Sequence, residues 1–189
     1  DAVRSGKLDE QARNKFLAEM TEEVGQLVLR INYLQSLSLS LSQTRGSREI
    51  GFQRRLMQML EHEGRLDRAV ENLPDEGELT ERALRGEGLT RPELAVLLAY
   101  AKLSLYDRLL DSPVPDDPYL GRELQRYFPK VMQDRYGEEI ENHRLRREII
   151  ATQLSNAIVN RGGPTVIARL VDETGADGAT IAAAYAAVR

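Results

Sequence analysis

The fold is decided by the stretch Leu89-Thr90-Arg91-Pro92-Glu93-Leu94-Ala95-Val96-Leu97-Leu98-Ala99-Tyr100-Ala101-Lys102-Leu103. Thr90 predicts a helix N-cap, because its hydroxyl can accept a backbone N–H that the first turn leaves unpaired. Pro92 suits the first turn, where a missing N–H costs nothing, and Glu93 completes a capping box with Thr90. Lys102 is the only charged residue in the apolar run that follows. A helix that is apolar on nearly every side must be enclosed, so the stretch predicts a buried central helix that ends near Ser112.

A long helix is predicted ahead of this one, from about Asp9 to Gln43. Apolar residues recur in it at spacings of three and four, and only Ser38 breaks the row. This spacing is typical of a coiled-coil seam. The Ser-Leu alternation over 36–42 would also suit a strand, but the helical register before it favours a helix. We take the seam as the first candidate contact surface, made of Leu17, Met20, Val24, Leu27, Ile31, Leu34 and Leu41.

Other helices are expected where glycine, proline or capping residues bracket the remaining apolar runs. We place them over 48–63, 67–72, 75–85, 118–128, 138–160 and 164–175, with a short helix closed by Gly137 and a last one from about Gly178. No segment shows the alternation of a strand with hairpin turns, so the fold class is all-α, a multi-helix bundle with no significant sheet. The polar connector from Pro113 to Pro118 is the candidate boundary between 1–112 and 113–189, which we expect to pack as one continuous domain.

Composition excludes several classes of function. The chain has 189 residues, of which 41% are hydrophobic, so it can bury a core and is not disordered. A net charge of -4 argues against nucleic acid as a partner. The apolar run is shorter than the roughly 20 residues that cross a bilayer, so no membrane association is expected. The absence of cysteine excludes disulfides and thiolate sites and is compatible with a cytoplasmic protein.

Motifs that could carry chemistry are weak, and we predict no catalytic, cofactor-binding or metal-binding residue. His62 and His143 lack the spacing of a helical metal site, so solvated surface positions are favoured. Lys102 could act as a desolvated base, but a lysine in this setting more often lays its stem along apolar surface.

Two glycine-containing loops, 86–91 and 161–165, could offer N–H groups to an anion. Neither follows a strand, so tight turns between helices are favoured. The basic group Arg144, Arg146 and Arg147 is surrounded by glutamates, which indicates ion pairs on a helix surface.

A row of uncharged polar residues forms the second candidate contact surface. Thr152, Asn156 and Asn160 recur every fourth residue, with Gln153 beside them. A buried amide must be hydrogen-bonded or it costs about 1–3 kcal/mol, so the row could face another helix or a neighbouring domain. A partly exposed polar stripe is an equally open alternative.

Three stretches of the chain resemble the C-terminal helical region of the large bacterial NAD-specific glutamate dehydrogenases. They are 20–35 (Met-Thr-Glu-Glu-Val-Gly-Gln-Leu-Val-Leu-Arg-Ile-Asn-Tyr-Leu-Gln), 89–105, and 149–165, which contains Ile-Ile-Ala-Thr-Gln-Leu-Ser-Asn and Val-Asn-Arg-Gly-Gly-Pro-Thr. The resemblance implies a parent enzyme that converts L-glutamate to 2-oxoglutarate and ammonia with NAD. It places the catalytic lysine and the NAD-binding fold upstream, so no cofactor is expected in these residues.

The resemblance also implies the partners: the catalytic domain of the same polypeptide and further copies of the parent in a homo-oligomer. The last residues, Thr180 to Arg189, look helical and lack a stop signal, so we expect a piece of a longer chain. Its expected role is a noncatalytic structural or regulatory domain. The alternative is a free-standing helical interaction protein that dimerises through its first helix. A self-contained helical-bundle enzyme is disfavoured, because no acid–base or metal constellation is present.

Overall fold

The structure is a computed structural model that describes residue 6 and residues 9–188. In these residues the elements are α-helices and short 3-10 turns, with no strand, so the predicted all-α fold is confirmed. The α-helices are α1 (Glu10–Arg45), α2 (Ile50–His62), α3 (Glu76–Leu84), α4 (Arg91–Leu110), α5 (Gly121–Tyr127), α6 (Lys130–Glu141), α7 (Arg146–Gly162), α8 (Val166–Thr174) and α9 (Gly178–Ala187). The 3-10 turns are η1 (Gly46–Glu49), η2 (Val114–Asp116) and η3 (Pro118–Leu120).

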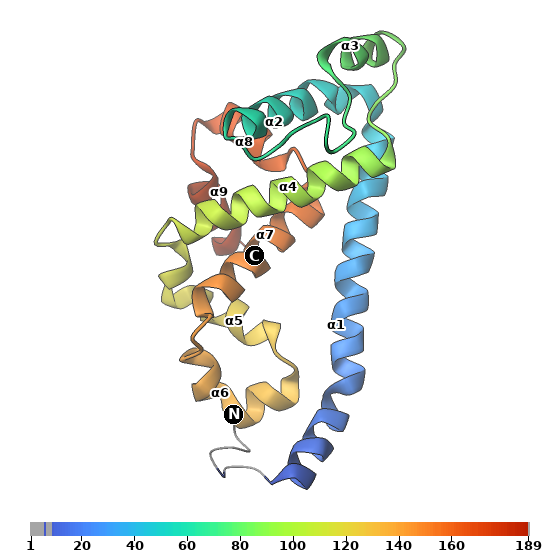
Figure 1. Cartoon of the computed structure of the whole chain (residues 1–189). Helices are drawn as coiled ribbons and strands as arrows, with labels where there is room; N and C mark the ends of the chain where they lie inside the picture. Colours follow the sequence, from blue (N-terminus) through green and yellow to red (C-terminus); the bar gives the residue numbers. More distant parts are fainter. Residues whose placement is uncertain (1–5, 7–8, 189) are drawn as a thin grey trace.

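The long first helix is confirmed and is bounded by local signals at both ends. Asp9 caps its start, because its Oδ1 accepts the backbone N–H of Ala12 at 2.7 Å. Gly46 ends it with a φ of 54°, a conformation that favours glycine. Figure 1 shows α1 running down one side of the molecule, with its C-terminal part against α4 and α7 and its N-terminal part near α6. Most of α1 is therefore covered by other helices on one side only, and its remaining surface is exposed.

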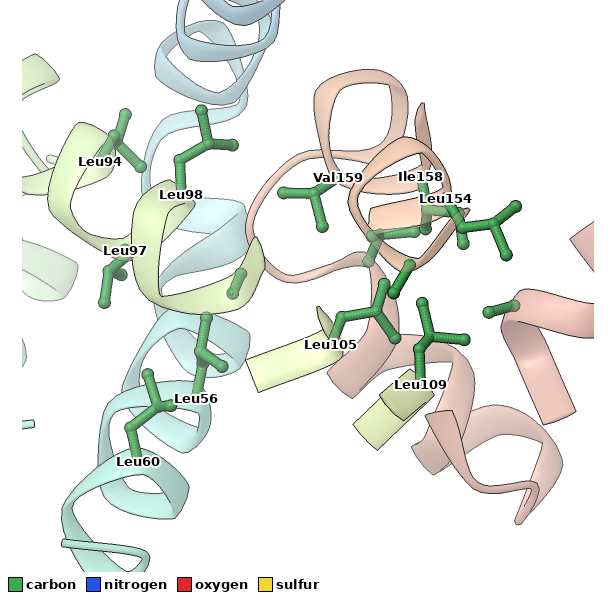
Figure 2. Close-up of a cluster of buried hydrophobic side chains, with 14 of the residues drawn as sticks. Leu56, Leu60, Leu94, Leu97, Leu98, Leu105, Leu109, Leu154, Ile158 and Val159 are labelled. Carbon is green, nitrogen blue, oxygen red and sulfur yellow. The ribbon is translucent and has the colours of Figure 1, made fainter. Parts of the chain in front are cut away.

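The central helix α4 begins with the predicted capping box, in which the backbone N–H of Thr90 donates to Glu93 Oε2 at 2.7 Å. Its apolar face lies between α2 and α7, and it packs most extensively on α7 (Figure 2). Its burial is one-sided, however, because Ala99 is exposed and Leu103 is 57% exposed. The core residues that Figure 2 labels are Leu56, Leu60, Leu94, Leu97, Leu98, Leu105, Leu109, Leu154, Ile158 and Val159.

Two predicted helices are wrong. Residues 67–72 form turns, because Asp67 Oδ1 accepts the N–H groups of Ala69 and Val70 and so satisfies the backbone without a helix. The predicted helix over 138–160 is broken at 142–145. There Asn142 Nδ2 donates to the Glu138 carbonyl at 3.0 Å, and such local side-chain bonds compete with helix continuation. Next to Gly137 the helix α6 is kinked, because Tyr136 has a non-helical φ of -133° and ψ of 32°, and a helical segment continues beyond the kink to Glu141.

The connector after α4 is held by Arg147 of α7. This guanidinium pairs with Asp116 and donates to the carbonyls of Leu110 and Ser112 at 2.7 and 3.1 Å. The expected helix-surface pairs with glutamates are thus wrong for Arg147, because the helix break re-aims it at the carboxyl end of α4. The connector remains the candidate boundary between 1–112 and 113–189, while α4 and α7 on its two sides pack together.

Candidate interface between helices α1 and α7

A cleft of about 840 Å³ lies between α1 and the pair α5 and α7. The α1 wall is mostly apolar but also carries Glu23 and Arg30, and the α7 wall carries amide side chains and Arg161, while the ends of α5 and α6 close the remaining side. The two candidate contact surfaces therefore face one another across this cleft. Its lining includes Val24, Leu27, Val28, Ile31 and Leu34 from α1, and Gln153, Asn156, Ala157, Asn160 and Arg161 from α7.

Most but not all of the predicted contact residues lie in the cleft. Four positions of the seam, Val24, Leu27, Ile31 and Leu34, line it together with Asn156 and Asn160. The remaining positions lie outside its lining, and these are Leu17, Met20, Leu41 and Thr152. The hydroxyl of Thr152 is used within its own helix, because Thr152 Oγ1 donates to the Glu148 carbonyl at 2.7 Å.

Ser38 joins α1 to α7 through a hydrogen bond. This residue interrupts the apolar row, and it is buried with its Oγ donating to the Val159 carbonyl at 3.3 Å. Its small side chain lets α1 approach α7 closely. The next residue of α7, Asn160, lines the cleft and is only 6% exposed, and its Oδ1 has no hydrogen-bond partner among the described residues. A buried acceptor without a donor is costly, so this amide favours a hydrogen-bond donor in the cleft.

The other end of α1 is held by α6. The ring of Phe16 meets that of Tyr136 edge-on at 5.6 Å, and Arg135 lies 5.2 Å from the Phe16 centroid. The Glu23 carboxylate accepts the backbone N–H of Lys130 at 2.9 Å, which satisfies the start of α6. Phe16 is not among the predicted contact residues because it precedes the start of the regular row, although an aromatic residue next to the seam is a signal for such a contact. Contacts at both ends thus hold α1 across the cleft.

A buried carboxylate joins the end of α1 to the chain after α7. Glu49 is 8% exposed and its Oε2 accepts from Thr165 Oγ1 at 2.6 Å. Arg45 and Arg169 lie 3.5 and 3.8 Å from its Oε1. This carboxylate therefore links η1, α1 and α8 in one polar junction.

The glycine-containing loops serve backbone packing at the same junction. A β-carbon on Gly88 would lie 2.8 Å from the carbonyl carbon of Gly46, so only glycine allows this approach. Gly163 has a φ of 87° and lies against Ser42 Oγ. Both loops are tight connections between helices, which supports the interpretation favoured over phosphate binding.

Lys102 reaches from α4 toward α1. Its Nζ donates to Gln35 Oε1 at 3.4 Å, and burial lowers the pKa of this lysine below its usual value. Lys102 thus joins α4 to α1 through a neutral amide, and the interpretation in which its stem packs along apolar surface stays a prediction. Within the described ranges, no group of three or more His, Cys, Asp or Glu side chains is placed to hold a metal ion. In the same residues, no helix combines the length and apolar character needed to cross a membrane.

The structure is thus an all-helical domain with a cleft between α1 and the pair α5 and α7. Comparison with known proteins gives its family. Residues 86–189 match the family described as glutamate dehydrogenase, C-terminal, and the chain belongs to that family. Residues 1–42 match a second family, described as the catalytic domain of bacterial NAD-glutamate dehydrogenase.

Three similar proteins are all named NAD-specific glutamate dehydrogenase. The NAD-specific glutamate dehydrogenases of Pseudomonas aeruginosa and Halomonas elongata are each 46% identical over all 189 residues of this chain. That of Mycobacterium tuberculosis is 36% identical over 173 residues, or 92% of this chain. The chain spans only 11–12% of the length of these relatives.

The two family matches assign helix α1 to one family and the helices from α4 onward to the other. The catalytic-domain match ends within the last turn of α1, and the C-terminal match begins just before α4. One wall of the cleft therefore comes from the catalytic-domain segment and the other from the C-terminal family. Sites between such units are common places for contacts and ligands.

Proposed function

We propose that this chain is the noncatalytic helical C-terminal part of an NAD-dependent glutamate dehydrogenase. The parent reaction converts L-glutamate, NAD and water to 2-oxoglutarate, ammonia and NADH. NAD is bound by the parent outside these residues, in a cytoplasmic homo-oligomer. The role of the chain is structural or regulatory: it covers or supports the catalytic core and its assembly.

One observation supports this proposal most directly. Helix α1 matches the catalytic-domain family, whereas α4 to α9 match the C-terminal family. The same helix is held to the C-terminal body at Ser38, at Phe16 and at the Glu49 junction. Because α1 belongs to one unit and packs on the other, it would fix how the two units are placed relative to each other. This suits a supporting or regulatory domain.

The test compares the full-length enzyme with residues 1–189 alone. NADH formation from glutamate and calorimetric NAD binding are measured for both, and far-UV circular dichroism establishes that the shorter protein is helical. We expect turnover and NAD binding only in the full-length enzyme. NAD binding or glutamate turnover by folded residues 1–189 would contradict the noncatalytic role.

A second candidate function is self-association through α1 as a free-standing interaction protein. The seam supports it, because Leu17 and Leu41 are 51% and 47% exposed and lie beyond the cleft. Light scattering over a range of concentrations separates the two. A dimer that dissociates when Leu17 and Leu41 are changed to serine favours this alternative.

A further inference from the structure

Helix α1 carries a second apolar row outside the lining of the cleft. Leu29, Tyr33 and Leu37 follow one another at every fourth position and so share one face. They are 63%, 66% and 38% exposed, and none of them lines the cleft. We call these three residues the outer stripe.

The surroundings of the outer stripe are those of a contact surface. No charged residue occurs from Ile31 to Thr44, although a solvated helix normally carries charges on its outer face. The interior of a protein interface is depleted in charge and enriched in aromatic residues. One edge of the stripe is already occupied, because Arg91 donates to Ser40 Oγ at 3.0 Å. The three side chains of the outer stripe themselves are exposed.

We propose that the outer stripe is the surface on which the preceding part of the same polypeptide, the catalytic domain, packs. This inference rests on the proposed function and names the surface that it uses. The stripe lies within residues 1–42, which match the catalytic-domain family, and the relatives are about eight times longer than this chain (189 residues being 12% of their length). A helix that belongs to a domain packs on the rest of that domain.

The outer stripe is the apolar face of α1 that is available for a contact with the catalytic domain. Another face of α1 is directed at α7, through Ser38 and the residues that line the cleft. An apolar partner surface therefore covers Leu29 and Leu37, with a hydrogen-bond acceptor in reach of the Tyr33 hydroxyl. In the assembled enzyme α1 lies between two bodies, the catalytic domain on its outer side and the C-terminal helices on its inner side.

The experiment is hydroxyl-radical footprinting of the full-length wild-type enzyme, read by mass spectrometry. Tyr33 is 66% exposed here and Tyr119, which lies in the C-terminal family segment, is 50% exposed. Exposure in this structure alone would make Tyr33 the faster to be oxidised. We expect the reverse order in the full-length enzyme, since the catalytic domain covers Tyr33.

Two variants of the full-length enzyme complete the test. Tyr33→Glu places a charge in the contact and is expected to lose NADH production and to restore fast oxidation of α1. The matched control is Leu84→Glu, at an 84% exposed position that belongs to neither family match. It is expected to keep wild-type activity.

The outcomes separate the inference from the proposed function. An active wild-type enzyme whose Tyr33 is oxidised faster than Tyr119 overturns the outer stripe and leaves the proposed function intact. Protection of Tyr33 that disappears on dilution shows a second copy as the occupant and also overturns the inference. A wild-type enzyme that forms no NADH from glutamate contradicts the proposed function instead, while the footprint of Tyr33 still decides whether the stripe is covered.

Discussion

Ser38 of α1 donates a hydrogen bond to the backbone carbonyl of Val159 in α7, 121 positions away in the chain, at 3.3 Å. The one residue that interrupts the apolar row of α1 is therefore the residue at which α1 crosses α7. A leucine would have completed the row for a coiled coil, whereas a serine allows a closer crossing and satisfies its hydroxyl on a helix carbonyl. The contact joins the catalytic-domain segment to the C-terminal family segment.

Replacement of Ser38 tests this crossing. Ser38→Leu is expected to lower the free energy of unfolding by about 1–3 kcal/mol, because a larger side chain overfills a packed contact. Ser38→Ala is expected to cost about 1 kcal/mol, for the lost hydrogen bond. Urea unfolding followed by circular dichroism measures both. A stabilising Ser38→Leu would show that the seam prefers a continuous coiled coil, as the self-association alternative requires.

The Glu49 junction is expected to depend on the hydroxyl of Thr165. Thr165→Val removes the donor to Glu49 Oε2 and leaves a buried carboxylate with fewer partners, at a cost of about 1–3 kcal/mol. Thr180→Val is the matched control, because Thr180 Oγ1 donates to Asp177 on an exposed surface. Thermal and urea unfolding of the two variants are compared. Equal stability losses in the two variants would show that the buried Thr165–Glu49 hydrogen bond contributes no more to stability than an exposed one.

The capping box of α4 predicts a dependence of stability on pH. Burial pulls the pKa of Glu93 upward, but hydrogen bonds from Arg82, at 2.8 and 3.0 Å, and from Thr90 outweigh it and hold the pKa below its usual value of 4.5. A carboxylate whose pKa is lowered in the folded state stabilises the fold fully above its unfolded pKa and loses this contribution as pH falls through the folded pKa.

Glu93→Gln should therefore be less stable than the wild type near neutral pH. The difference is expected to shrink as the pH falls from about 4.5. Urea midpoints measured at neutral and acid pH give this difference, and Glu81→Gln, at an exposed carboxylate, is the control. A difference that stays constant across the acid range would contradict the assignment.

Gly88 and Gly51 should respond to alanine with opposite signs. Gly88→Ala is expected to destabilise the fold, because the new β-carbon would meet the Gly46 backbone at 2.8 Å and backbone cannot move aside cheaply. Gly51 lies in α2 with open space around it, so Gly51→Ala is expected to stabilise by about 0.5–1 kcal/mol through helix propensity. Melting temperatures of the two variants check the pair, and a neutral Gly88→Ala would refute the close approach.

The helices whose ends carry local signals were predicted well. The Thr90–Glu93 capping box, the Asp9 cap and the glycine after α1 act through hydrogen bonds or dihedral preferences within a few residues, so the sequence displays them directly. The break at 142–145 was missed because Asn142 and His143 each bond to nearby backbone, and the surrounding residues are good helix formers. The partners of Arg147 were missed for the same reason, since the break redirects its side chain.

By itself, the sequence determined the helical class and the two principal helices, because periodicity and capping are local properties, and it predicted two rows of residues as contact surfaces. The tertiary structure alone decided that those surfaces face each other across one cleft and that α1 keeps a second apolar row, Leu29, Tyr33 and Leu37, outside the lining of that cleft. A helical repeat defines which residues share a face. It does not define what covers that face, because the partner is chosen by packing between segments more than a hundred residues apart, as Ser38 and Val159 are.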